Sequence, residues 1–131
     1  MDELPIQTGD DVVRIRQHVR NAAAGCGLSL VDQTKLVTAA SELARNTLIH
    51  GGGGVVRVEV VKSAVGRNGV RLHFADEGPG IPDVDLALTD GWTSGSGLGL
   101  GLSGSRRLVD EFELKSEPGL GTNVVVVKWS R

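Results

Sequence analysis

The sequence predicts an α+β fold, a two-layer sandwich in which helices pack on one face of a mixed, mostly antiparallel sheet. Two observations support this fold class. Segments in the N-terminal half repeat apolar residues every three or four positions, as amphipathic helices do. Later segments are rich in β-branched residues and fall into two pairs, each joined by a short turn. The expected order is strand, helix, helix, hairpin, long loop, helix, hairpin, within one domain over residues 1–131.

The N-terminal residues predict a short strand followed by a helix. The strand over 4–8 (LPIQT) is expected at a sheet edge, because Pro5 has no N–H to donate. The helix is expected to start after Asp10 and to end at the glycines 25 and 27. Its buried stripe comprises Val12, Ile15, Val19, Ala22 and Ala23.

A second helix is expected from Ser29 to about His50. Ser29 and Asp32 have the spacing of a capping box, which marks a helix start. The four consecutive glycines 51–54 end the helix. Its buried stripe comprises Leu36, Ala40, Leu43, Ala44 and Thr47.

The second half of the chain predicts two hairpins with a loop and a helix between them. The loop is long for a small domain, and loops of this length are usually functional. Leu98, Leu102 and Val109 give the helix its core-facing stripe, which Phe112 continues beyond it. The expected ranges are 55–62 and 70–76 for the first hairpin, 77–97 for the loop, about 98–109 for the helix, and 112–117 and 122–129 for the second hairpin.

The amino-acid composition of the chain disfavours several classes of function. Aromatic residues make up 3% of the chain and Tyr is absent, which disfavours a nucleic-acid binder that stacks bases on rings. The net charge of −2 gives no basic footprint for nucleic acid or for an anionic membrane. The single Cys26 excludes an internal disulfide, and no apolar run is long enough to span a membrane. These features predict a cytoplasmic domain with no nucleic-acid or membrane partner.

A first motif lies in the second predicted helix. Glu42, Asn46 and His50 recur at a spacing of four, which places them on one helical face. A carboxylate and a carboxamide one turn apart are suited to pairing a proton acceptor with a metal ligand. The alternative is an ordinary solvated face on which Glu42 pairs with Arg45.

A second motif, DEGPGIP at 76–82, follows a predicted strand directly. The carboxylate of Asp76 could accept a hydrogen bond from a ligand amine, and Gly78 and Gly80 would permit close backbone approach. The alternative is that these residues form only a turn.

A third motif, SGSGLGLGLSG at 94–104, formally matches G-x-G-x-x-G. The dinucleotide fingerprint requires a preceding strand in a parallel unit, whereas a long loop and antiparallel hairpins are expected here. A Walker A loop is excluded because the chain has no Gly-Lys pair. The remaining interpretation is a glycine-rich loop that leads into a helix N-terminus, which favours an anion.

In this order, the three motifs resemble the nucleotide-binding fold of the GHKL family, which comprises gyrase, Hsp90, histidine kinases and mismatch-repair ATPases. ELARNTLIHG is similar to the family's N box, DEGPGI to its first glycine box and GSGLGLGL to its second. Gly121 and Thr122 are similar to its threonine position. The resemblance covers about residues 10–129.

The resemblance implies a role for each matching residue. Asn46 would bind Mg²⁺ that bridges the ATP phosphates, and Asp76 would bind the adenine amino group. Thr122 would support the adenine contact through water, residues 83–97 would form a lid, and Glu42 would act as the general base. Gly78, Gly80 and Ile81 would line the base, and the amides of Gly97, Leu98, Gly99, Leu100 and Gly101 would hold the phosphates.

Within the family, SLVDQTKLVTAASELARN and GLGLGLSGSRRLVDEFELKSEPGLGT most closely resemble the RsbT-type switch kinases of the stressosome, in the anti-sigma regulatory factor family. This implies a serine/threonine protein kinase that uses ATP and Mg²⁺ to phosphorylate STAS-domain antagonist proteins. Once released, it would activate a PP2C-type phosphatase. The alternatives are an anti-sigma factor that binds sigma directly, a non-catalytic ATP-binding interaction module and an ATPase without a protein substrate.

Overall fold

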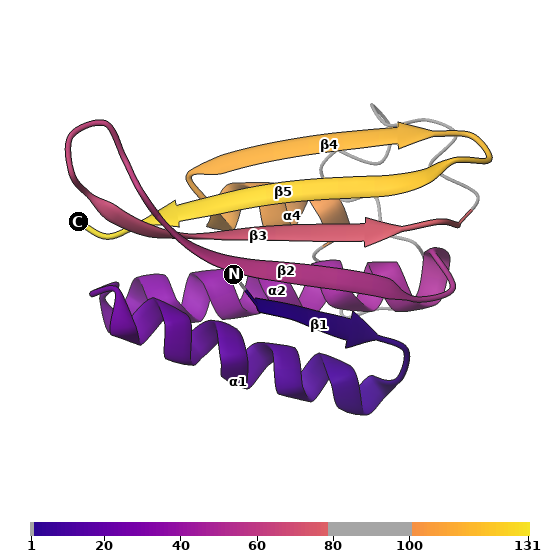
Figure 1. Cartoon of the computed structure of the whole chain (residues 1–131), viewed down its shortest axis with the longest axis horizontal. Coiled ribbons are helices and arrows are strands. Elements are labelled where there is room, and N and C mark those ends of the chain that lie inside the picture. Colours follow the sequence, from indigo (N-terminus) through magenta and orange to yellow (C-terminus); the bar gives the residue numbers. More distant parts are fainter. Residues whose placement is uncertain (1, 79–100) are drawn as a thin grey trace.

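The computed structural model describes residues 2–78 and 101–131, which form a five-stranded sheet with helices against one face (Figure 1). The strand order is β1-β2-β3-β5-β4, so the last hairpin places β5 inside the sheet and β4 at its edge. All four neighbouring pairs of described strands are antiparallel, so the expected parallel component is wrong for this part of the chain. The strands are β1 (Asp2–Ile6), β2 (Gly54–Lys62), β3 (Asn68–Asp76), β4 (Glu111–Glu117) and β5 (Gly121–Trp129), and the helices are α1 (Gly9–Gly25), α2 (Leu30–His50) and α4 (Gly101–Leu108).

The first strand lies two residues earlier than the sequence predicts, because its last expected residues belong to a helix cap. Thr8 is the N-cap of α1, and its hydroxyl accepts a hydrogen bond from the Asp11 amide at 3.4 Å. The Asp11 carboxylate in turn accepts from the amides of Gln7 and Thr8, at 2.8 and 3.1 Å. This capping box, which the sequence analysis missed, ends β1 at Ile6 and starts α1 at Gly9.

The start of α2 confirms half of the prediction made for it. The Ser29 hydroxyl accepts from the Asp32 amide at 3.1 Å, so Ser29 is the N-cap. The Asp32 carboxylate, expected to close a capping box with Ser29, lies instead 3.7 Å from the ammonium group of Lys128 on β5. The side chain is used for a tertiary contact in place of a local one.

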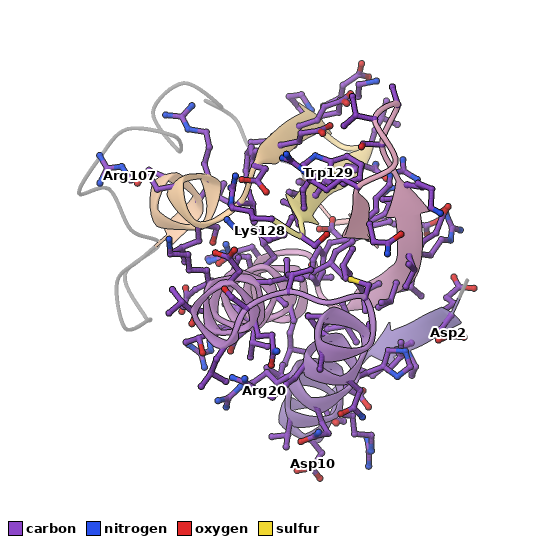
Figure 2. All side chains as sticks on the ribbon, turned by 90° about the vertical axis from the view of Figure 1, so that its left-hand side faces the viewer. Asp2, Asp10, Arg20, Arg107, Lys128 and Trp129 are labelled. Carbon is purple, nitrogen blue, oxygen red and sulfur yellow. The ribbon has the colours of Figure 1, made fainter. Side chains whose placement is uncertain are left out.

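The core lies between the helices and the facing side of the sheet. α2 lies between α1 and α4 (Figure 2). A wider part of its surface is therefore buried than the single stripe of residues that the sequence predicts. All five stripe residues of α2 are buried, and so are Val37 and Ala39. In α1 the predicted stripe is buried except for the partly exposed Ala22. The sheet contributes Val56, Val58, Val70, Leu72, Phe74, Val124 and Val126, which alternate along their strands.

The remaining boundaries agree with the prediction to within two residues where the structure describes them. Each hairpin strand has its expected end and starts one or two residues earlier. The described part of the third helix is α4, which ends at Leu108, one residue before the predicted end. The expected helix residues 98–100, and residues 79–97 of the expected loop, lie outside the described residues. None of the described helices is both long and apolar enough to cross a bilayer.

Candidate functional site

The candidate site lies at the end of the sheet where β3 stops and α2 ends, on the right in Figure 1. Asp76 is the last residue of β3 and shares the helix-facing side of the strand with Phe74 and Leu72. Its Oδ1 atom accepts hydrogen bonds from the amides of Gly78 and Thr122, at 2.9 and 3.2 Å. Both bonds orient the carboxylate at the sheet end.

Three glycines bring the backbone against Asp76. A Cβ atom added to Gly51 would overlap the Asp76 carboxyl group, and one added to Gly78 would lie 2.6 Å from the Cα of Gly51. Gly121 has φ of +93° and packs its backbone against the Asp76 carbonyl. Gly78 and the position of Gly121 were predicted from the sequence, whereas Gly51 was assigned only to the end of α2. A run of four glycines is longer than the end of a helix requires. The extra glycines were the signal in the sequence that backbone packs closely against another group here.

A pair of hydroxyl groups extends the row that begins at Asp76. Thr122 lies opposite Asp76 on β5, and Ser116 lies opposite Thr122 on β4. Ser116 Oγ is 3.0 Å from Thr122 Oγ1 and donates to the Gly121 carbonyl at 3.3 Å. Ser116 was not predicted as a site residue, although the hairpin pairing around 118–121 already implied that it faces Thr122.

Two of the three polar residues predicted to share one face of α2 are less solvated than an ordinary surface face. Glu42 is 8% exposed, Asn46 is half-buried and His50 is exposed at the end of the helix. Arg45 pairs with Glu42, at 3.3 Å between Nη1 and Oε1, which is the pairing that the alternative interpretation of this helix face predicted. One Glu42 oxygen is therefore held by a cation on the same helix, while the carboxylate as a whole is withdrawn from solvent.

Most of the residues predicted to bind the phosphates, and two of those predicted to line the base, fall in the part of the chain that the structure does not describe. Gly80, Ile81, Gly97, Leu98, Gly99 and Leu100 lie outside the described residues, and Gly101 is the first residue of α4. The structure therefore brings together Asp76, Gly78 and Thr122, while Glu42 and Asn46 share the helix that ends beside them.

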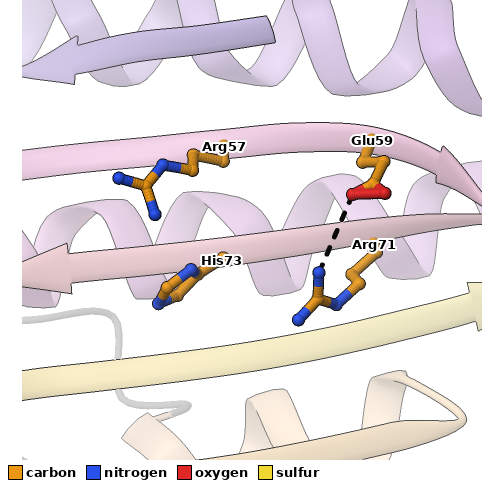
Figure 3. A pocket seen from close by; sticks show the side chains of 4 residues that line it. All are labelled: Arg57, Glu59, Arg71 and His73. Carbon is orange, nitrogen blue, oxygen red and sulfur yellow. Dashed lines mark ion pairs between the residues drawn. The ribbon is translucent and has the colours of Figure 1, made fainter. Parts of the chain in front are cut away.

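A hollow lies on the opposite face of the sheet, away from the helices (Figure 3). It is lined by Arg57, Glu59, Arg71 and His73, which alternate with core residues along β2 and β3. Arg71 and Glu59 face each other across the strands at 3.7 Å, and His73 contacts Asn123 at 2.9 Å. The hollow is therefore a cross-strand polar surface, separate from the Asp76 site.

The fold agrees with comparisons to known proteins. Residues 31–130 match the family described as histidine kinase-, DNA gyrase B-, and HSP90-like ATPase, and the chain belongs to this family. Within it, the chain is 44% identical over 126 residues to the serine/threonine-protein kinase RsbT of Bacillus subtilis. That alignment covers 96% of this chain and 94% of the relative, so the enzyme class is that of the serine/threonine-protein kinases.

Two more distant relatives extend this relationship. The anti-sigma F factor of Thermoanaerobacter sp. (strain X514) is 32% identical over 95 residues, which cover 70% of this chain and 66% of the relative. A crystal structure of the RsbU and RsbW domains of a Mycobacterium tuberculosis protein superimposes with a TM-score of 0.65 at 23% identity. It covers 100% of this chain and 33% of that longer chain, and it supports the fold.

Proposed function

We propose that the chain is a serine/threonine protein kinase of a bacterial partner-switching pathway. It would use ATP and Mg²⁺ to phosphorylate STAS-domain antagonist proteins and, once released from them, would activate a PP2C-type phosphatase. The observation that carries the proposal is the Asp76 carboxylate, oriented by two amides and enclosed by glycine backbone at the end of the sheet. The relationship to a serine/threonine-protein kinase along nearly the whole chain supports the same function.

Asp76 fits the amino group of adenine. Its Oδ1 already accepts two amides, while Oδ2 receives no hydrogen bond from residues 2–78 and 101–131. An ionised carboxylate can only accept, so its partner must be a donor such as an exocyclic amine. Thr122 would support this contact through water. Gly78, Gly80 and Ile81 would line the base, and the amides of Gly97, Leu98, Gly99, Leu100 and Gly101 would hold the phosphates.

Asn46 fits a magnesium ion that is shared with the nucleotide. Its carboxamide oxygen is a ligand type that Mg²⁺ accepts, and it projects from the half-buried face of α2. When bound, Mg²⁺ neutralises charge on the transferred phosphoryl group. We expect Asn46→Ala to abolish Mg-ATP turnover, and unchanged turnover would reject the metal assignment.

Glu42 is the proposed general base. Arg45 holds one of its oxygens, and the other can accept the proton of a substrate Ser or Thr hydroxyl. Its withdrawal from solvent favours this role over that of an ordinary solvated helix face. A positioned carboxylate of this kind contributes roughly 10²–10⁴-fold to the rate.

The test is phosphate transfer from labelled ATP to a STAS-domain protein. We expect Glu42→Gln to lower the transfer rate by roughly 10²–10⁴-fold while nucleotide affinity is retained. Glu113→Gln, which alters a carboxylate on the exposed strand β4, is the matched control and should transfer normally. Transfer at the wild-type rate by Glu42→Gln would contradict the base assignment, and a stable complex without label would contradict the kinase proposal.

The relatives named anti-sigma F factor favour a second candidate, direct binding of a sigma factor. The two functions differ in the partner that the chain captures. Co-purification with a purified sigma factor, without phosphate transfer to any STAS-domain protein, would favour this second function.

A further inference from the structure

The hydroxyl groups of Ser116 and Thr122 form a hydrogen-bonded chain whose direction is set by the carbonyl at its end. Ser116 Oγ lies 3.3 Å from the carbonyl oxygen of Gly121 and 3.0 Å from Thr122 Oγ1. A carbonyl oxygen only accepts hydrogen bonds, and a serine hydroxyl has one proton to donate. With Ser116 donating its proton to the Gly121 carbonyl oxygen, the hydrogen bond between the two hydroxyls is donated by Thr122 and accepted by Ser116.

This direction leaves Thr122 as an acceptor toward the site. With its proton directed at Ser116, Thr122 Oγ1 offers lone pairs alone to a ligand. The neighbouring Asp76 carboxylate, opposite Thr122 in the sheet, is also an acceptor when ionised. The row Asp76–Thr122 thus presents acceptor side chains at the sheet end.

We infer that Ser116 is a positioning residue that makes the site selective for a purine with a 6-amino group over one with a 6-oxo group. The inference rests on the proposed function, in which the adenine of ATP binds at Asp76. A 6-amino group donates to acceptors, whereas a 6-oxo group meets them with its own lone pairs and stays unpaired. Ser116 acts by keeping the Thr122 proton away from the ligand.

Removing the Ser116 hydroxyl would release the Thr122 proton. In Ser116→Ala the Thr122 hydroxyl is free to rotate and to donate to a 6-oxo group, directly or through water. The discrimination between the two bases therefore falls, even though Ser116 itself touches neither of them. A purely structural role for Ser116 predicts a different result, the same loss of affinity for both nucleotides.

The experiment compares the affinities of Mg-ATP and Mg-ITP, which differ at the purine 6-position and at the adjacent N1 proton. The measure of selectivity is the Kd of Mg-ITP divided by the Kd of Mg-ATP. We expect this ratio to fall about tenfold in Ser116→Ala, as the loss of one oriented hydrogen-bonding contact implies. Ser116→Thr retains the hydroxyl, suits a strand position and should retain the ratio. Ser116→Cys, with a weaker donor, should give an intermediate ratio and serves if the alanine variant does not fold.

A double-mutant cycle shows whether Ser116 acts through Thr122. Thr122→Val should lower the ratio by itself, and adding Ser116→Ala to it should cause no further change. An unchanged ratio in both Ser116→Ala and Ser116→Cys, or equal weakening of both nucleotides, would overturn the inference while leaving the kinase proposal intact. Failure of the wild-type chain to bind ATP would overturn the proposed function and this inference with it.

Discussion

At the scale of single residues, the site depends on how closely backbone can approach the Asp76 carboxyl group. Gly51 has φ of −89° and ψ of −9°, which any residue can adopt, so its backbone conformation does not require glycine. The requirement comes from space, because a side chain at Gly51 would occupy the volume of the Asp76 carboxyl group. Gly51 is therefore a packing partner of the site in addition to ending α2.

Gly51→Ala tests this packing. We expect the new Cβ to displace the Asp76 carboxyl group and to weaken ATP binding by about tenfold, as the loss of one hydrogen-bonding contact implies. Titration calorimetry with Mg-ATP measures the loss. Gly25→Ala is the matched control, because a Cβ at Gly25 meets open space. Equal ATP affinity in the two variants would show that the carboxyl group has room to move.

Asp110 is a carboxyl group whose protonation is expected to destabilise the fold at low pH. Burial raises its pKa, but the Trp129 amide and the charges of Lys128 and Arg131 outweigh burial, so the pKa lies below the ordinary 3.8. A carboxyl group with a lowered native pKa stabilises the fold above its unfolded pKa, and this contribution is lost as the pH falls through the native pKa.

Asp110→Asn should therefore reduce stability in a pH-dependent way. We expect the difference in unfolding free energy from wild type to be constant at neutral pH and to shrink once the pH falls below 3.8. Urea unfolding of both proteins at a series of pH values measures it. A difference that persists unchanged in strong acid would mean that Asp110 acts by packing alone.

At the scale of elements, local capping decides where α1 begins. Thr8 and Asp11 satisfy amides that the first turn of the helix leaves without an intrahelical partner. The same bonds end β1 two residues earlier than its apolar pattern suggests. A cap can thus set the boundary of the preceding strand as well as that of its own helix.

Thr8→Ala should lower the free energy of unfolding by about 1 kcal/mol, the usual cost of losing an N-cap hydroxyl. Urea denaturation monitored by circular dichroism gives the value. Thr34→Ala removes an exposed hydroxyl that donates to Leu30 O within α2, and should change stability by less than about 0.5 kcal/mol. If both variants lose the same stability, the cap does not contribute.

At the scale of the whole molecule, a charged cluster lies at the end of the fold opposite Asp76. This end faces the viewer in Figure 2. Lys128 on β5 is 4% exposed and lies 3.4 Å from Asp110, which follows α4, and 3.7 Å from Asp32, in the first turn of α2. Arg131 pairs with both carboxylates. The cluster joins the first turn of α2, the segment after α4 and the end of β5, with the buried Lys128 ammonium group between the two carboxylates.

Lys128→Met should be strongly destabilising, because two carboxylates would lose their buried counter-charge. We expect a loss of about 3 kcal/mol in unfolding free energy. Lys115→Met is the control from the neighbouring strand, since Lys115 pairs with Glu113 at 3.1 Å but is 78% exposed, and should cost less than about 1 kcal/mol. Similar losses in the two variants would show that burial does not strengthen the Lys128 cluster.

The sequence by itself determined the elements and their inward faces. Hydrophobic period and turn residues are local, so they predicted both hairpins, α2 with its buried stripe and the placing of Asp76 at a strand end. The three motifs in order also indicated the family to which the chain belongs.

The tertiary structure decided which distant residues meet. That β5 lies beside β3, that Gly51 packs on Asp76 and that Asp32 faces Lys128 are contacts between segments far apart in the sequence. No local pattern specifies such contacts, because each depends on how strands pair and helices pack. Local periodicity therefore determined what each segment forms, and packing decided which side chains the site contains.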